Sequence, residues 1–226
     1  MHTENIKKIK EMFELQQKLN DETNGSEWIH GTTKHGKQIN WKRCIHLEGA
    51  EFIGSFPWKH WKNIEGEADW DNAKIELVDI WHFLMSEIIR TESYSSLESF
   101  YKHIIFNTYT QTQETKEQEK ILAVMEKIIN EATTPLTNLN VLSRLFFEAC
   151  ALIGLSLDEL YAQYIGKNAL NKFRQDNGYK EGTYIKIWNG KEDNAVMQSI
   201  IAAEPFLSFE QLLFELHKSY EAAKGE

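Results

Sequence analysis

Two segments of the sequence carry acidic side chains at a spacing that suits metal binding. Glu48 and Glu51 lie three residues apart in one segment, and Glu76 and Asp79 lie three apart in the other. Residues three apart on an α-helix leave the same face, with Cβ atoms about 5–6 Å apart. Apolar residues flank both pairs, so helices here would hold carboxylates against apolar surface, where an unpaired charge is costly.

Two such helices facing each other would offer a set of hard oxygen ligands. Carboxylate oxygens of this kind suit Mg²⁺ and, with it, a bound polyphosphate. The alternative is two solvated acidic faces, because a chain with 34 acidic residues among 226 contains several such pairs by chance. Spacing alone does not separate the two interpretations.

Asp79 and His82 suggest a second kind of metal site, because an acid-x-x-His element is typical of di-iron helical bundles. Such bundles need a matching element on another helix. The only Glu-x-x-His in the chain, Glu27 to His30, falls in a glycine-containing segment. The sequence therefore favours a hydrogen-bonded, partly buried His82 over a di-iron ligand.

A cluster of cationic and aromatic residues lies nearer the C-terminal end. Lys167, Asn171 and Arg174 are four and three residues apart and share one helix face. Arginine can donate two parallel hydrogen bonds to one phosphate, and lysine supplies a mobile charge. The segment that follows adds Tyr179, Lys180, Tyr184 and Lys186. The cluster predicts an anion site; the alternative is a basic helix end favoured by the helix dipole.

Amide and indole side chains could recognise a nucleobase. Gln17 and Asn20 lie three apart and offer both donors and acceptors to the edge of a pyrimidine. Trp58 and Trp61 could stack on a base. The alternatives are a surface position for each amide and a core position for each tryptophan.

Hydrophobic periodicity predicts the helices that carry the acidic pairs. Apolar residues recur at helical steps over 4–20 and again from Trp41 to about Ser55, where Pro57 follows. The next helix is expected to start at a cap on Asp69 or Asp71 and to reach about Arg90.

The rest of the chain also reads as helical. Helices are expected over 96–107, 114–131, 139–153, 158–173 and, in two pieces broken at Pro205, 194–223. Loops are expected over 21–40 and 176–192, with Thr183–Trp188 as the only short strand candidate. The sequence predicts an all-α protein, and its 226 residues suit one large domain or two small ones. Because 139–153 is apolar on nearly every side, we expect it near a two-fold interface of a homodimer.

Composition excludes several classes of protein. The net charge of −9 argues against a nucleic-acid partner, which would need a basic surface. The N-terminal segment is rich in lysine and glutamate, and no apolar run approaches the ~20 residues of a membrane helix. Two cysteines without a CxxC pair fit a reducing compartment. A cytoplasmic protein without a membrane partner is expected.

The segments, taken in order, resemble the dimeric all-α dUTPases, which belong with MazG-like and dCTPase-dUTPase enzymes to the all-α NTP pyrophosphatases. The resemblance covers residues 10–90 and 160–200. It implies one domain over 1–226, an all-α helical bundle in which 91–140 is a variable helical region. Its motifs are LQQKLNDETNG, WKRCIHLEGAEFIGSFPWKHWKN, KIELVDIWHF and GKNALNKFRQDNGYKEGTYIKIWNGKEDN.

The resemblance implies roles for residues at matching positions. The implied metal ligands, which are also the catalytic residues, are Glu48, Glu51, Glu76 and Asp79. The implied phosphate-binding residues are Lys167, Asn171, Arg174, Tyr179, Lys186 and Asn194. The implied base- and sugar-binding residues are Gln17, Asn20, Trp61 and His82.

The resemblance also implies an activity. A homodimer with more than one Mg²⁺ would hydrolyse dUTP, and also dUDP, to dUMP and so limit uracil incorporation into DNA. Two alternatives stay open: a related pyrophosphatase for dCTP or another dNTP, and a nucleotide-sensing or partner-binding protein without turnover. The complete set of four carboxylates argues against the second.

Overall fold

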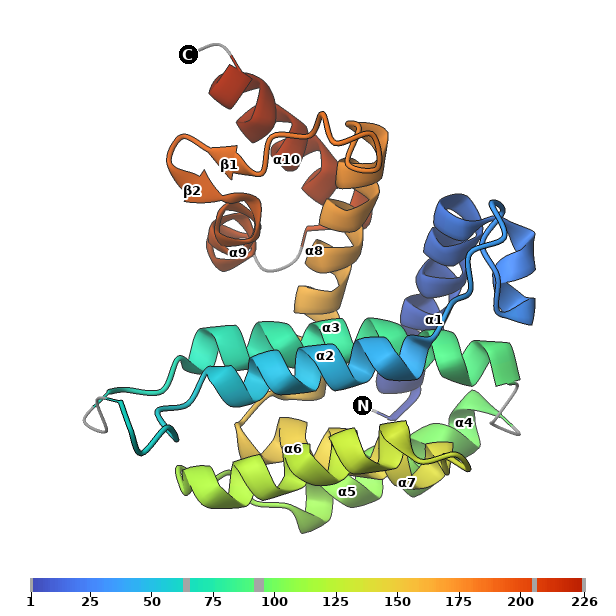
Figure 1. Cartoon of the computed structure of the whole chain (residues 1–226), viewed down its shortest axis with the longest axis vertical. Helices are drawn as coiled ribbons and strands as arrows, with labels where there is room; N and C mark the ends of the chain where they lie inside the picture. The colour runs from blue at the N-terminus through green and yellow to red at the C-terminus, as the bar shows by residue number, and fades with distance from the viewer. Residues whose placement is uncertain (1, 63–65, 92–95, 205–206, 225–226) are drawn as a thin grey trace. The chain divides into compact units, whose positions relative to one another are not determined.

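The computed structural model describes residues 2–62, 66–91, 96–204 and 207–224, and these are largely helical (Figure 1). The predicted all-α class is confirmed. Contacts group the chain into two compact units, Met1–Leu157 and Asp158–Glu226. The single functional domain expected over 1–226 stays a prediction. In the described part of the chain, no single helix is long and apolar enough to cross a membrane.

The first unit is built on two antiparallel helices, α2 (Trp41–Gly54) and α3 (Trp70–Thr91) (Figure 1). Its other helices are α1 (His2–Asn24), α4 (Leu97–Phe100), α5 (Asn107–Gln111), α6 (Gln118–Thr133) and α7 (Leu139–Leu152). A short 3₁₀ helix, Ser26–His30, follows α1, and a π-helical turn, Tyr101–Phe106, joins α4 to α5. The predicted helix over 96–107 is therefore made up of α4 and the π-helical turn. The helix predicted over 114–131 corresponds to α6, which begins four residues later than expected.

Local hydrogen bonds set the ends of α2 and α3. Asn40 caps α2 by accepting a hydrogen bond from Arg43 N at 2.9 Å. Asp69, one of the two predicted caps, does the same for α3 by accepting from Asn72 N at 2.9 Å. Ser55 ties the two helices together: its carbonyl accepts from Asp69 N at 2.8 Å, and its Oγ accepts from Asn72 Nδ2 at 2.9 Å. These bonds hold the end of α2 beside the start of α3.

The core of the first unit forms around α3. Trp81, fully buried, stacks on Phe146 of α7 with ring centroids 5.3 Å apart and an angle of 11° between the planes. It also meets Phe147 of α7 and Phe13 of α1 edge to face. Aromatic contacts of this kind add to the hydrophobic free energy of burial, and they fix the rotation of α3 about its axis.

Helix α7 is covered inside one chain. Leu142, Phe146, Phe147 and Cys150 are fully buried, and the neighbours of α7 are α6, α5, α3 and the π-helical turn. The apolar composition of 139–153 is therefore no evidence for a two-fold interface, and the interface itself stays a prediction. Burial by a ring of neighbouring helices explains its composition without a partner chain.

The second unit packs three helices and a hairpin around aromatic rings. It contains α8 (Leu157–Asp176), β1 (Ile187–Trp188), β2 (Lys191–Glu192), α9 (Asp193–Ala203) and α10 (Phe209–Lys224). Asn189 and Gly190 turn the hairpin with φ of 48° and 78°, as expected for an Asn-Gly turn. Only the last two residues of the strand candidate Thr183–Trp188 belong to a strand, β1. The expected break at Pro205 lies outside the described residues.

A close approach of α6 to α2 makes Gly49 a test of this packing. A Cβ at Gly49 would lie 2.8 Å from Ile129 Cγ1 and 3.2 Å from Met125 Sδ, whereas one at Gly54 on the same helix meets nothing within 4 Å. We expect Gly49→Ala to lower the free energy of unfolding by about 1–2 kcal/mol, because overpacking outweighs the helix propensity of alanine. Gly54→Ala should leave it unchanged or raise it. Urea unfolding measures both; equal stability of the two variants would contradict the packing.

Candidate metal centre and nucleotide-binding residues

Three of the four predicted carboxylates come together between α2 and α3. Glu48 of α2 and Glu76 and Asp79 of α3 each offer one oxygen, and these oxygens lie within 4.8 Å of one another. Glu76 is buried, with 7% of its surface exposed, and the other two are half-buried. The i, i+3 spacing on α3 and the Ser55 tie between the helices account for this meeting.

The donor set fits a divalent cation. Carboxylate oxygens are the hard ligands that Mg²⁺ and similar ions prefer. Three carboxylates this close also repel one another, and a bound cation relieves that repulsion. Glu51, the fourth predicted ligand, is exposed and falls outside this group of three among the described residues. A metal role for Glu51 stays a prediction.

The predicted base-reading amides are only partly placed as expected. Asn20 is buried and donates from Nδ2 to Ser86 Oγ at 2.9 Å, whereas Gln17 is exposed. The buried amide is Gln16, which donates to the same Ser86 Oγ at 3.1 Å. His82, also buried, contacts Gln16 Oε1 through Nδ1 at 2.7 Å. A polar network therefore joins α1 to α3.

Helical phase could have identified Gln16. Ile9, Met12 and Phe13 are buried on α1, and the residues one turn further along the same face are Gln16 and Asn20. A buried polar residue in line with apolar ones indicates a hydrogen-bonded network. Ser86 gives no such signal, because a small hydroxyl in an apolar helix is common.

Trp61 lies at the surface. It is 62% exposed, Trp58 is 41% exposed, and their ring centroids are 5.6 Å apart at an angle of 87°. His60 meets Trp61 edge to face at 4.9 Å. The core position considered for these two tryptophans is therefore wrong, and both rings are accessible to a ligand.

In the second unit, the predicted phosphate-binding residues centre on a buried ion pair. Arg174 of α8 donates from Nε and Nη2 to the two carboxylate oxygens of Asp193, both at 2.8 Å. Asp193 is fully buried. Burial raises the pKa of this carboxyl, but the hydrogen bonds and charge of Arg174 outweigh burial and hold the pKa below its usual value. Asp193 is therefore charged in the folded protein.

The other predicted phosphate-binding residues lie around this pair or on the hairpin. Lys167 donates to Asn194 Oδ1 at 3.1 Å, and Arg174 Nη1 contacts Asn171 Oδ1 at 3.4 Å. The half-exposed ring of Tyr179 lies 5.6 Å from the Arg174 guanidinium. Lys186 pairs with Glu192 at 3.6 Å.

Tyr184 joins the ion pair as a third member. Its hydroxyl donates to Asp193 Oδ2 at 2.8 Å. Burial first, and then the neighbouring Asp193 charge, raise the pKa of Tyr184. The hydroxyl therefore keeps its proton and acts as a hydrogen-bond donor. The sequence singled out Tyr184 only as part of the cationic and aromatic cluster.

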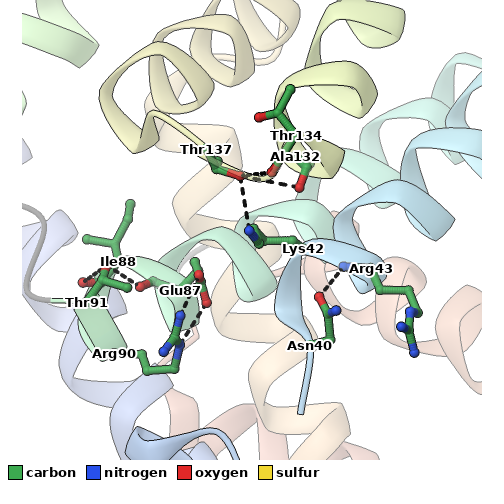
Figure 2. A network of polar contacts seen from close by, with 10 residues as sticks. All are labelled: Asn40, Lys42, Arg43, Glu87, Ile88, Arg90, Thr91, Ala132, Thr134 and Thr137. Atoms are coloured by element: carbon green, nitrogen blue, oxygen red, sulfur yellow. Dashed lines mark hydrogen bonds and ion pairs between the residues drawn. The ribbon is translucent and has the colours of Figure 1, made fainter. Parts of the chain in front are cut away.

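A cavity elsewhere in the first unit contains none of the predicted site residues. It has a volume of about 680 Å³ and is lined in part by Lys42, Glu87 and Thr137. Lys42 Nζ donates to Thr137 Oγ1 at 3.2 Å, and Glu87 forms an ion pair with Arg90 at 2.7 Å (Figure 2). Because this cavity contains none of the three grouped carboxylates, we place the chemistry at Glu48, Glu76 and Asp79.

Fold and site together define an all-α protein with a candidate divalent-metal centre on two antiparallel helices. A family model described as dUTPase matches residues 8–179. The chain therefore belongs to the dUTPase family, as the resemblance in the sequence predicts, and is a dUTP diphosphatase that acts on a nucleotide. Members of the family generally use a divalent metal. No curated protein matches the chain.

The three-carboxylate group predicts the behaviour of single substitutions. Glu76→Gln should weaken Mg²⁺ binding by at least about tenfold, because even the loss of a residue that only supports a metal ligand costs about that much affinity. It should also lower kcat by orders of magnitude without loss of helix content. Asp71→Asn removes an exposed carboxylate from the same helix and should change neither. Isothermal titration with Mg²⁺ measures the first effect. Unchanged Mg²⁺ affinity in Glu76→Gln would rule out the centre, and the same titration of Glu51→Gln decides whether Glu51 is a ligand.

Proposed function

We propose that the chain is a Mg²⁺-dependent enzyme that hydrolyses dUTP to dUMP and pyrophosphate, and dUDP to dUMP and phosphate. The observation that carries this proposal is the meeting of Glu48, Glu76 and Asp79 oxygens within 4.8 Å in a member of the dUTPase family. Mg²⁺ is the expected ion because all three donors are carboxylate oxygens and because a polyphosphate supplies further oxygen ligands.

Glu76 and Asp79 of α3 and Glu48 of α2 would hold the metal. Bound there, Mg²⁺ neutralises polyphosphate charge and favours ionisation of a water molecule. Glu48 is our candidate general base, because it is the one carboxylate of the three that comes from α2 and so faces the two ligands of α3 from the other helix. It would accept the proton of the attacking water while a new P–O bond forms at the α- or the β-phosphorus. The bond from that phosphorus to the oxygen that bridges the α- and β-phosphates would break.

Recognition of the base is proposed for the polar network of the first unit. Asn20, Gln16 and His82 are buried; Ser86 Oγ orients the two amides, and Gln16 Oε1 contacts the His82 ring. Fixed amide groups can select one pyrimidine edge because the wrong base leaves buried donors or acceptors unmatched. Trp61 offers an exposed ring for stacking. Gln17 offers an exposed amide on α1, the helix that carries Gln16 and Asn20.

Binding of the phosphates is proposed for the second unit. Lys167, Asn171, Arg174, Tyr179 and Asn194 are brought together by the contacts of α8 and α9 described above. Lys186 on the hairpin would reach the ligand only by exchanging its ion pair with Glu192 for one with phosphate. Arginine and lysine donors suit an anionic ligand that carries several phosphates.

A substrate panel tests the activity directly. With Mg²⁺, dUTP should be converted to dUMP and pyrophosphate at a higher kcat/KM than dCTP, dTTP or UTP, and dUDP should also be hydrolysed. EDTA should abolish turnover, and Mg²⁺ should restore it. Liquid chromatography of the nucleotides measures each product. Preference for dCTP would move the enzyme to a related specificity, and turnover in EDTA would exclude the metal mechanism.

We also propose a homodimer that works in the cytoplasm. The dimer rests on the resemblance to the dimeric all-α dUTPases, since α7 is already covered within one chain. Light scattering at micromolar concentration should return about twice the chain mass of 26.4 kDa. A single mass of 26.4 kDa across that range would contradict the dimer.

A further inference from the structure

Asp193 is a buried carboxylate whose four hydrogen bonds leave each oxygen with two donors. Oδ1 accepts from Arg174 Nη2 and from the Asn194 backbone N–H, both at 2.8 Å. Oδ2 accepts from Arg174 Nε and from the Tyr184 hydroxyl, both also at 2.8 Å. Asp193 is fully buried, so its oxygens are not available to a ligand. Any role in binding must therefore act through its donors.

The bidentate contact with Asp193 decides which edge of the Arg174 guanidinium remains for another acceptor. A guanidinium carries five N–H donors in a rigid plane. Asp193 occupies the edge formed by Nε and Nη2. The adjacent edge, formed by Nη1 and the second N–H of Nη2, makes only the long 3.4 Å contact with Asn171 Oδ1 in the part of the chain described here. That edge can still donate two parallel hydrogen bonds to one phosphate.

The residue next in sequence acts on a second cation. Asn194 accepts from Lys167 Nζ at 3.1 Å, and Lys167 itself is 5% exposed. Asp193 and Asn194 form the first turn of α9, whereas Lys167 and Arg174 lie two turns apart on α8. One dipeptide therefore orients two cationic side chains of the proposed phosphate site.

We propose that Asp193 is the positioning residue for nucleotide polyphosphate binding: it fixes Arg174 by one edge so that the other edge meets the outer phosphates. The inference rests on the proposed phosphate role of the second unit. Tyr184 supports Asp193, because its hydroxyl supplies one of the four hydrogen bonds. A purely structural role, in which the ion pair only joins α8 to α9, would affect stability without regard to the ligand.

The principal variant is Asp193→Asn, which keeps the size of the side chain but replaces one acceptor oxygen by a donor that opposes the Arg174 fork. We expect KM for dUTP to rise by at least about tenfold, the scale of one charged hydrogen bond, with a much smaller change in the inhibition constant of dUMP, which lacks the outer phosphates. Tyr184→Phe, which removes a single hydrogen bond, should raise KM for dUTP by about threefold. It serves as the test if Asp193→Asn does not fold.

The matched control is Asp176→Asn. Asp176 also pairs with a cation of α8, Lys172, but this pair is partly exposed. Exposed ion pairs contribute little, so KM for dUTP should stay within about twofold. Thermal melting of all variants measures the structural contribution separately.

A double-variant cycle decides whether Asp193 acts through Arg174. Arg174→Lys replaces the guanidinium and both of its edges by one ammonium group, so adding Asp193→Asn to it should raise KM little further. Additive effects, equal losses for dUTP and dUMP, or a fall in melting temperature with unchanged KM would each overturn the inference. Calorimetry with inorganic tripolyphosphate separates this failure from that of the proposed function. If the wild type binds tripolyphosphate and Asp193→Asn does not, the positioning role stands even where dUTP is not turned over.

Discussion

The antiparallel register of α2 and α3 is the constraint on which the metal centre depends. Neither helix supplies three carboxylates to one point, because an i, i+3 pair offers two. Ser55 accepts hydrogen bonds from Asp69 and Asn72 and thereby sets how far the two helices are offset. With this offset Glu48 meets Glu76 and Asp79. The close packing of α6 on Gly49 and the stacking of Trp81 on Phe146 hold the two helices in that position.

In the second unit, the positions of the cationic side chains matter more for anion binding than their number. Residues 167–194 contain six cationic and four acidic residues, a local net charge of +2 in a chain of −9. Arg174, Lys172 and Lys186 each form an ion pair with an acidic residue of the same unit. A simple excess of positive charge, as the sequence suggests, therefore does not describe this region. Directed donors, held by buried acceptors such as Asp193, account better for anion binding here.

Periodicity predicted much of the fold because helices bury one face and show it in the sequence. The expected segments 41–55 and 69–90 match α2 and α3 closely, and three of four carboxylates on them meet. What periodicity could not supply is long-range pairing. Asp193 reads as one more acid at a helix start, since nothing local links it to Arg174 nineteen residues earlier. The three-residue spacing to Asn20 selects Gln17, whereas the buried amide is Gln16, which lies in line with the apolar face of α1. The apolar composition of α7 does not show how many neighbours surround it, because a sequence gives the faces of a helix but not the helices that cover them.

The most direct test of the metal centre is anomalous diffraction from crystals of the protein with Mn²⁺ in place of Mg²⁺, since Mn²⁺ shares its preference for oxygen ligands. The account predicts an anomalous peak bound by carboxylate oxygens of Glu48, Glu76 and Asp79 together. A peak bound by other residues, or none at these three carboxylates in a protein that needs Mg²⁺ for turnover, would contradict it.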